Sequence, residues 1–333
     1  MKVAFFIHSL EAPSSRYRVL QYLPYLKNQG VDGGIHFYKR KWFDKLNFYN
    51  TLSQYDIFFI HRRLFSPLEF WYIRQKAKKI VYDFDDALMY RSSGSKSPYS
   101  FSRRVKFAYM IKRVDYVIAG NHFLKSKVLP YNPHVIVIPT AIDLSQYSLK
   151  EHFSEVGPIT IGWLGSSSTL KYLKTLMPVF ENLYKKYPNL QLKVVCDQFL
   201  DSLSIPLIKK RWSSDEEEVD LKSFDIGLMP LVDDPWSWGK CGLKIIQYQG
   251  VGLPVVCTPV GVNQDLIEDG INGFLAKTPE EWEKKLSTLI EDPLLREKMG
   301  REGRKRILEA YTVQSCAPRL LSVLQGVMEE KSR

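Results

Sequence analysis

Three aspartates stand within four residues, at Asp83, Asp85 and Asp86, directly after the apolar run of residues 80–82. Carboxylates placed this way can accept a hydrogen bond or proton from a substrate hydroxyl, or stabilise positive charge that develops on a reacting group. Two of them could instead hold Mg²⁺ or Mn²⁺ beside a diphosphate. One of the three is expected simply to cap the next helix, and the sequence does not decide which carboxylate acts.

Two basic groups also follow apolar runs. Residues 12–18 (APSSRYR) place Ser15, Arg16 and Arg18 at a helix start, a combination that suits a phosphate or carboxylate. The alternative is that Ser14 or Ser15 caps this helix and the arginines are solvated. His61 and Arg62 follow the run of residues 56–60, where a histidine could carry a proton or contact a substrate, although a lone histidine is more often structural.

The segment of residues 238–263 reads as a loop, a helix, a glycine turn and a short buried strand. Gly242 at the helix start leaves backbone N–H groups and the positive end of the helix dipole for an anion, above all a phosphate. Lys240, Lys244 and Gln247 follow i, i+4, i+7 spacing, which predicts one helical face with two cations and an amide. We expect Lys240 at an exposed helix start, where its removal lowers turnover far more than stability. An ordinary solvated lysine face fits the same spacing.

The surrounding elements have the pattern of an α/β protein. Short apolar runs alternate with amphipathic stretches, which predicts βαβ units and parallel sheets whose carboxyl edges carry the loops named above. We predict strands at residues 3–7, 31–37, 56–60, 80–82, 116–119, 135–138, 159–164, 190–196, 226–229 and 255–258. We predict helices at residues 16–29, 67–79, 280–291 and 293–311, with the last helix extending toward Glu330. The polar, aperiodic residues 143–158 are read as a linker between two such series.

Composition limits the function classes. The 333 residues suffice for two domains, and four scattered cysteines indicate neither a zinc site nor a disulfide framework, which fits a reducing cytosol. No apolar run has the length of a membrane span. The net charge of +11 requires an anionic partner: nucleic acid, an anionic membrane face or a phosphorylated substrate.

Residues 242–276 (GLKIIQYQGVGLPVVCTPVG…DLIEDGINGFLA) resemble the donor-site segment of retaining glycosyltransferases of family 4. The family pattern is Glu, seven residues, Glu, and then a small-residue turn and a Pro-Val-Val strand. Its two glutamates fall on Gly239 and Gln247, so the chain resembles a divergent branch with a Lys-Cys-Gly opening. The resemblance implies the GT-B fold, with two Rossmann-like domains facing across a cleft. Residues 1–150 would bind the acceptor and residues 151–315 the donor, and a C-terminal helix, residues 316–333, would cross back onto the first domain.

The resemblance also assigns expected roles. Residues 165 and 166 match the family's Gly-Arg position, with serine replacing the arginine, and Lys171 keeps the second cation of a diphosphate grip; a helix cap at Ser166 is the alternative. The expected donor-binding residues are Gly165, Ser166, Lys171, Gly239, Cys241, Gly242, Leu243, Lys244 and Gln247. The expected catalytic residues are Asp83, Asp85, Asp86 and Lys240. The expected acceptor residues are Ser15, Arg16, Arg18, His61, Arg62 and Asn121. GT-B enzymes generally need no metal, so no metal or other cofactor is expected.

The implied reaction is hexosyl transfer from a UDP- or GDP-sugar to a lipid-linked glycan with retention of configuration, in surface polysaccharide or glycan assembly. The implied setting is the cytoplasm, with peripheral contact to the anionic inner face of the cell membrane. One alternative is a nucleotide-sugar or glycan-binding protein without turnover, because both motif glutamates are absent. Another is a nucleic-acid-binding protein, suggested by a pI of 9.3. It is disfavoured because no basic stripe with stacking aromatics is evident.

Overall fold

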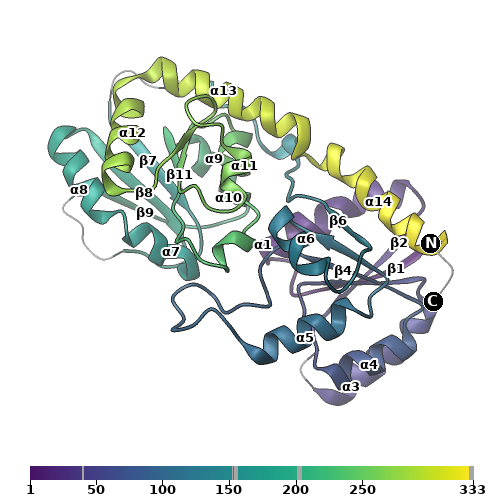
Figure 1. The fold of residues 1–333 in the computed structure, drawn as a ribbon. Helices are drawn as coiled ribbons and strands as arrows, with labels where there is room; N and C mark the ends of the chain where they lie inside the picture. Colours follow the sequence, from purple (N-terminus) through teal and green to yellow (C-terminus); the bar gives the residue numbers. More distant parts are fainter. Residues whose placement is uncertain (40, 152, 154–156, 201–204, 330–333) are drawn as a thin grey trace. The chain divides into compact units, whose positions relative to one another are not determined.

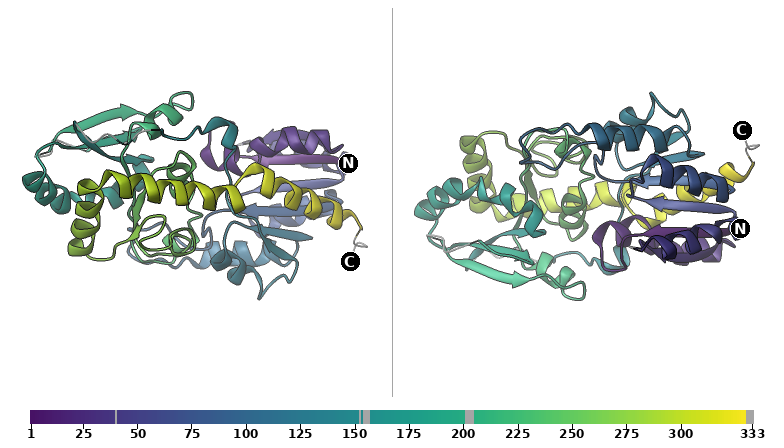
Figure 2. Two further views of the ribbon diagram at one scale, coloured as in Figure 1. Left: turned by 90° about the horizontal axis from the view of Figure 1, so that it is seen from above. Right: turned by 90° about the horizontal axis from the view of Figure 1, so that it is seen from below.

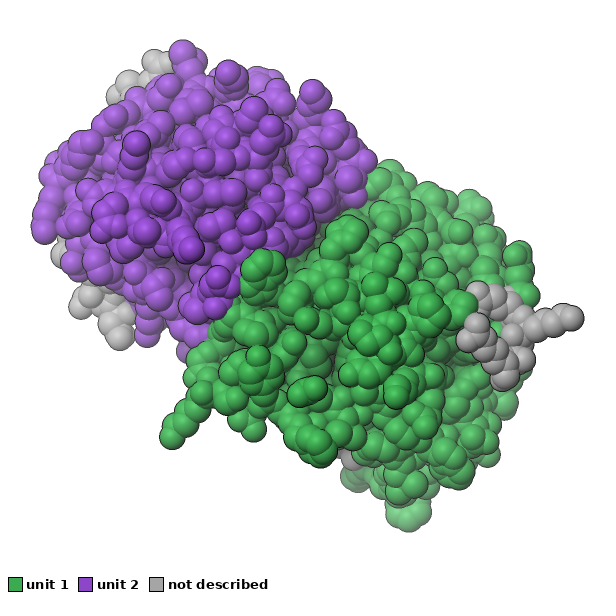
Figure 3. Space-filling view, in the orientation of Figure 1, with its two compact units in different colours: residues 1–141, 234–241, 313–333 green, residues 142–233, 242–312 purple. Residues whose placement is uncertain are grey.

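The computed structural model describes residues 1–39, 41–151, 153, 157–200 and 205–329. The chain packs as two compact units, coloured separately in Figure 3. Unit 1 comprises Met1–Ala141, Asp234–Cys241 and Val313–Arg333, and unit 2 comprises Ile142–Asp233 and Gly242–Thr312. The division therefore falls after Ala141 rather than at residue 150. The short segment Asp234–Cys241 belongs to unit 1, although the residues before and after it in the sequence belong to unit 2.

Unit 1 is built on a six-stranded parallel sheet in the order β2-β1-β3-β4-β5-β6. The strands are β1 (Lys2–Ile7), β2 (Asp32–Phe37), β3 (Ile57–His61), β4 (Lys79–Phe84), β5 (Tyr116–Ala119) and β6 (Val135–Val137). Side chains alternate between the two faces of β1. Ala4 and Phe6 join the core beneath α3 (Trp42–Asn50), α4 (Pro67–Lys76), α5 (Phe101–Ile111) and α6 (His122–Val128). Val3 and Phe5 join the core beneath α2 (Leu23–Asn28) and α14 (Val313–Glu329) on the other face.

The single helix predicted at residues 16–29 is wrong. The chain instead forms α1 (Pro13–Arg18), a 3₁₀ turn at Leu20–Tyr22, and then α2. Pro24 occupies the first turn of α2, where its missing N–H and fixed φ are tolerated; inside a continuous helix it would remove a hydrogen bond and clash with the preceding turn. The alternative that Ser14 or Ser15 caps α1 is also wrong, because Ala12 is the N-cap residue.

Unit 2 repeats the architecture with a parallel sheet in the order β12-β11-β10-β7-β8-β9. The strands are β7 (Ile159–Leu164), β8 (Leu190–Cys196), β9 (Leu207–Arg211), β10 (Ile226–Met229), β11 (Val255–Cys257) and β12 (Phe274–Leu275). The helices are α7 (Ser167–Lys174), α8 (Met177–Lys186), α9 (Glu217–Lys222), α10 (Leu243–Gly250), α11 (Asn263–Leu266), α12 (Pro279–Glu291) and α13 (Pro293–Ala310). Two parallel sheets with helices confirm the predicted α/β class.

The C-terminal helix packs on unit 1, as predicted. α13 ends at Ala310 in unit 2, and α14 begins at Val313 and lies along the sheet of unit 1 (Figures 1 and 2). Its apolar side chains, including Leu320, Leu324 and Val327, are buried in the core beneath β1, β3 and β4. No helix among the described residues is long and apolar enough to cross a membrane.

Candidate functional site

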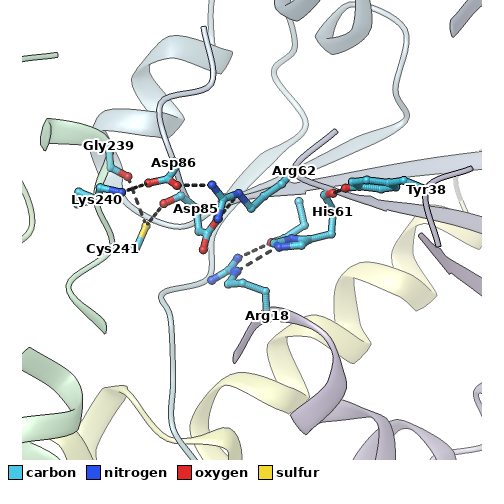
Figure 4. A network of polar contacts seen from close by, with 10 residues as sticks. Arg18, Tyr38, His61, Arg62, Asp85, Asp86, Gly239, Lys240 and Cys241 are labelled. Carbon is cyan, nitrogen blue, oxygen red and sulfur yellow. Dashed lines mark hydrogen bonds and ion pairs between the residues drawn. The ribbon is translucent and has the colours of Figure 1, made fainter. Parts of the chain in front are cut away.

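The carboxyl ends of β3 and β4 bring His61 and Asp83 side by side, because these residues are partners in the parallel register. Nδ1–H of His61 donates to Oδ2 of Asp83 at 2.7 Å, and the guanidinium of Arg18 donates to both Asp83 carboxylate oxygens (Figure 4). Arg18 also donates to the carbonyl of Ile138 at 2.7 Å. All three side chains are buried. The structure thus joins three predicted site residues into one closed cluster.

The charges within this cluster compensate one another. Burial alone would raise the pKa of Asp83, but the charge of Arg18 and the hydrogen bond from His61 outweigh it and lower that pKa. Burial alone would lower the pKa of Arg18, and Asp83 reverses the direction. Because Nδ1 of His61 is bound to the Asp83 carboxylate, Nε2 is the ring nitrogen left for another partner. This Nε2 is buried and has no hydrogen-bond partner among the described residues.

Arg62 turns the chain away from β3 in a strained conformation. Its φ is 58°, the left-handed region that non-glycine residues seldom adopt. Its backbone N–H donates to the carbonyl of Asp83 at 2.9 Å, which holds the turn in place. The turn aims the guanidinium at the two following aspartates: Nε lies 3.3 Å from Oδ1 of Asp85, and Nη2 donates to Oδ2 of Asp86.

Lys240 completes this second cluster. Its ammonium donates to Oδ1 of Asp86 at 2.8 Å and lies 5.0 Å from the centroid of the Trp236 ring. Burial opposes the charge of Asp86, but Lys240 and Arg62 reverse that effect and lower the pKa of Asp86. Burial likewise opposes the charge of Lys240, and Asp86 raises the pKa of Lys240. Asp86 is therefore a carboxylate held between two cations.

The segment Asp234–Cys241 is fastened to the rest of unit 1 by several further contacts. Nδ2 of Asn121 donates to the carbonyls of Trp238 and Lys240 at 3.2 and 2.9 Å, while its Oδ1 accepts from the N–H of Leu124 and caps α6. The thiol of Cys241 donates to the carbonyl of Asp85 at 3.3 Å. Asn121, expected as an acceptor residue, thus positions the backbone around Lys240.

Close packing against Ala87 requires a glycine at residue 239. A Cβ atom at this position would lie 2.5 Å from Cβ and 2.6 Å from the backbone nitrogen of Ala87. A glutamate, the residue that the expected family pattern would place here, therefore has no room in this arrangement. Glycine is required at residue 120 for the same reason, since an added Cβ atom would lie 2.4 Å from the sulfur of Cys241.

The other predicted acceptor residues lie in α1. Ser15 is buried, and its hydroxyl has no hydrogen-bond partner among the described residues. Arg16 is half-buried, with its guanidinium 5.3 Å from the centroid of the Tyr17 ring. Sequence reasoning missed Tyr38, whose hydroxyl donates to the carbonyl of His61. Its position just after β2 is the same signal that identified His61.

In unit 2 the start of α10 carries three of the predicted donor residues, whereas Gly239 and Cys241 belong to unit 1. Gly242 is the N-cap residue, with a left-handed φ of 70°, and it is buried. A Cβ atom added at this position would lie 2.3 Å from a side-chain atom of Leu266. Leu243 and Lys244 follow in the first turn and are half-buried. The ammonium of Lys244 lies 5.5 Å from the centroid of the Trp163 ring, and its stem passes within 3.0 Å of the Cβ position of Gly165.

The predicted helical face of Lys240, Lys244 and Gln247 is wrong. α10 begins at Leu243, and Lys240 lies before it with extended backbone angles of −67° and 143°. Lys240 is also paired with Asp86 rather than standing at an exposed helix start. Gln247 is buried, with Nε2 3.4 Å from the hydroxyl of Tyr147. Only Lys244 of the three remains at the start of α10.

The start of α7 is occupied by an acid. The N–H and hydroxyl of Ser167 donate to the Asp197 carboxylate at 2.7 and 2.8 Å, and these bonds lower the pKa of Asp197. Ser166 is the N-cap residue, and its N–H donates to the hydroxyl of Thr169 at 3.3 Å. Lys171 is exposed on the same helix. A phosphate beside this helix would meet Asp197, so α10 offers the more favourable electrostatic environment.

The carboxylates of Asp83 and Asp86 are paired with cations. Asp83 faces Arg18, and Asp86 faces Arg62 and Lys240. Within the described part of the chain, no cluster of three or more His, Cys, Asp or Glu residues could hold a metal ion.

Comparisons with known proteins agree with this architecture. Residues 158–292 match the family model described as glycosyl transferases group 1. The chain is 34% identical over 84 residues to a probable sucrose-phosphate synthase of Thermosipho melanesiensis, covering 25% of this chain and 19% of that protein. It is 30% identical over 96 residues to the putative glycosyltransferase EpsD of Bacillus subtilis, covering 27% and 25%. The chain therefore aligns with a quarter or less of these curated relatives.

Solved structures are similar over nearly the whole chain. The sucrose-phosphate synthase of Thermosynechococcus elongatus superposes with a TM-score of 0.80 at 13% identity, covering 98% of this chain and 99% of that chain. Anabaena HepE in complex with UDP and glucose gives a TM-score of 0.73 at 14% identity, with the same coverage. A glycosyltransferase of Rickettsia africae gives 0.69 at 13% identity, covering 99% of both chains. The predicted GT-B fold is confirmed.

Proposed function

We propose that this protein is a glycosyltransferase that moves a hexosyl group from a nucleotide sugar to a glycan acceptor, with retention of configuration. The observation that carries the proposal lies inside the segment similar to the glycosyltransferase family model. There, Gly242 is the N-cap residue of α10, and Lys244 stands in the first turn of that helix beside Gly165. A helix N-terminus with an adjacent lysine is suited to a diphosphate, the leaving group of such a reaction.

The proposed donor site uses the backbone of Gly242 and Leu243 and the ammonium of Lys244, with Lys171 as a second cation. Charge that develops on the departing diphosphate would be neutralised by the helix dipole and these lysines. A uridine nucleotide is the first choice for the donor, because the similar HepE structures contain UDP or UDP-glucose. No metal is required in this scheme.

The proposed acceptor site is the cation-carboxylate cluster of unit 1. Asp85 and Asp86 would accept hydrogen bonds from an acceptor hydroxyl, while Arg62 and Lys240 hold them in place. The buried His61, Asp83 and Arg18 would act behind them by fixing the turn at Arg62. We propose a lipid-linked glycan acceptor at an anionic cytoplasmic membrane face, in surface polysaccharide assembly, because the net charge is +11.

Calorimetric titration with UDP, GDP and their glucose conjugates tests the donor site. Lys244→Ala should weaken nucleotide binding about tenfold or more, the range for a hydrogen bond to a charged group. Lys174→Ala is the matched control, because Lys174 is exposed on α7 and has no proposed role. Equal affinities for both variants and the unmodified protein would remove Lys244 from the site.

Turnover and stereochemistry need a second measurement. Donor consumption with glycan acceptors should be followed by proton NMR, and the product should keep the anomeric configuration of the donor sugar. An inverted product would refute retention. Nucleotide binding without donor consumption for any acceptor would favour the non-catalytic binding protein instead.

A further inference from the structure

Three neighbouring helices of unit 1 expose large apolar side chains. α4 lies between α3 and α5 on one face of the sheet, and each helix packs its opposite side into the core (Figure 1). Phe43, Leu68 and Phe101 are 79%, 72% and 86% exposed. Together with the partly exposed side chains, the apolar set of this surface is Trp42, Phe43, Leu68, Trp71, Phe101 and Val105. Each of the three helices thus contributes two of these six residues. We call the surface that they form the α3–α5 surface.

The charge around the α3–α5 surface is strongly positive. Residues 91–113, which lead into and through α5, contain seven basic residues and no acidic one. Arg103 and Arg104 are exposed, and neither takes part in an ion pair among the described residues. The two acids on these helices are Asp44, which is exposed, and Glu69, which Lys45 neutralises at 2.9 Å. The surface therefore combines apolar side chains with uncompensated cations.

The aromatic residues have interfacial character. Trp42 and Trp71 are about half exposed, and the ammonium of Lys45 lies 5.9 Å from the centroid of the Trp42 ring. Tryptophan concentrates where hydrocarbon meets water, and basic residues beside exposed aromatic ones favour anionic headgroups.

The outer helices of unit 2 differ. α12 carries four acids against two lysines, and α13 exposes Leu294 and Leu308 singly among charges of both signs. Scattered apolar residues of that kind need no partner.

We propose that the α3–α5 surface docks on an anionic lipid bilayer, with Phe43 and Phe101 inserted between headgroups and Arg103 and Arg104 on lipid phosphates. The inference deepens the proposed function, because a lipid-linked acceptor lies in such a bilayer. Vesicle binding itself requires neither donor nor transfer, so it can be tested separately. Apolar insertion and charge attraction contribute together, and the charge contribution weakens in high salt.

Co-sedimentation of the full chain with vesicles is the test. Vesicles that contain phosphatidylglycerol should bind the protein, and vesicles of phosphatidylcholine alone should bind it much more weakly. R103Q/R104Q should weaken binding to anionic vesicles about 25-fold, from about fivefold for each charge. The control K298Q/K305Q removes the same charge from exposed positions on α13 and should stay within about twofold, since those charges lie outside the docked surface.

A second pair of variants tests the contribution of the apolar side chains to vesicle binding. F43S/F101S should weaken binding about tenfold for each phenylalanine, whereas L294S on α13 should have no effect. All these side chains are exposed, so thermal unfolding should show little change. Equal vesicle binding by all variants, or no binding by the unmodified protein, would overturn the proposal. A dimer that F43S/F101S dissociates, and that vesicles do not disrupt, would instead make this surface a contact between two copies.

UDP titration of the same variants separates the two proposals. Normal nucleotide affinity with lost vesicle binding supports the docking surface. Normal vesicle binding without any nucleotide affinity also supports it, and refutes the proposed function alone.

Discussion

The two units place polar residues at the carboxyl ends of parallel strands and use them differently. In unit 1, Arg18, Asp83 and His61 close on one another, and Arg62, Asp86 and Lys240 do the same. In unit 2, Lys244 lies over the indole ring of Trp163. An aromatic ring attracts a cation without cancelling its charge, whereas a carboxylate neutralises it. In unit 1 the paired charges fix the structure around Asp83 and Asp86, whereas the proposed donor site of unit 2 places a lysine against an aromatic ring.

Among these substitutions, Asp83→Ala should cause the largest change in the free energy of unfolding. It leaves the guanidinium of Arg18 buried without its carboxylate, so the free energy of unfolding should fall by about 3–5 kcal/mol. Urea denaturation measures the change, and Asp44→Ala on the exposed side of α3 is the control, with an effect below about 0.5 kcal/mol. A loss below about 1 kcal/mol for Asp83→Ala would mean that the cluster does not fix unit 1.

Acid should weaken the same clusters. The pKa values of Asp83 and Asp86 are lowered in the folded protein, so their contribution is fully present above the ordinary aspartate pKa of 3.8. It is lost as the pH falls from there through the lowered values. Urea denaturation between pH 6 and pH 2 should therefore show declining stability below about pH 4, and Asp83→Asn should reduce that decline. An unchanged decline in Asp83→Asn would assign acid sensitivity to other groups.

Gly239→Ala tests the seating of the segment Asp234–Cys241. The new methyl group would overlap Ala87, and overpacking of this kind costs about 1–3 kcal/mol of unfolding free energy. Gly326→Ala is the control and should not lower the free energy of unfolding. An added Cβ at residue 326 meets no atom within 4 Å, and alanine favours the helical conformation of α14. Equal stabilities for both variants would show that residue 239 has room for a side chain.

Lys240→Ala should reduce stability as well as turnover. The ion pair with Asp86 is mostly buried, with the Lys240 side chain 21% exposed, so we expect a loss of about 1–2 kcal/mol. A double-mutant cycle with Asp86→Ala isolates the pair, and its coupling energy should be of similar size. Additive effects of the two substitutions would mean that the two side chains do not interact in solution.

Lys244→Ala should have the smallest effect on stability. The residue is half-buried and stands in the first helical turn, where a cation is not favoured by the dipole, so the change should stay within about 0.5 kcal/mol. Thermal unfolding without nucleotide measures it. A loss comparable to that of Lys240→Ala would remove the contrast between the units.

The strands in the core were predictable, because buried parallel strands read as apolar runs. The predictions at residues 116–119, 190–196 and 226–229 coincide with β5, β8 and β10. β9 has the sequence LIKKR and alternates little, since it is a mostly exposed edge strand, so its residues gave no such signal. The break at Pro24 was visible in the sequence but was outweighed by the helical periodicity around it.

The site was less predictable than the fold. Strand ends placed His61 beside Asp83, because the parallel register brings successive carboxyl ends together. The pair between Lys240 and Asp86 joins residues 154 positions apart, and no local pattern indicates it. The i, i+4 spacing of Lys240 and Lys244 was misleading, because such spacing defines a face only within one continuous helix.

The interleaving of the two units has a consequence for anyone who would recombine this protein with a homologue. Because α14 covers one face of the first sheet, a fragment that ends at Ala141 would expose Val3, Phe5 and their neighbours to water. The same fragment would lack Lys240, the partner of Asp86. A chimera that exchanges unit 1 must therefore carry over three separate stretches of the gene, because a single crossover after Ala141 would combine the sheet of one parent with α14 and Lys240 of the other.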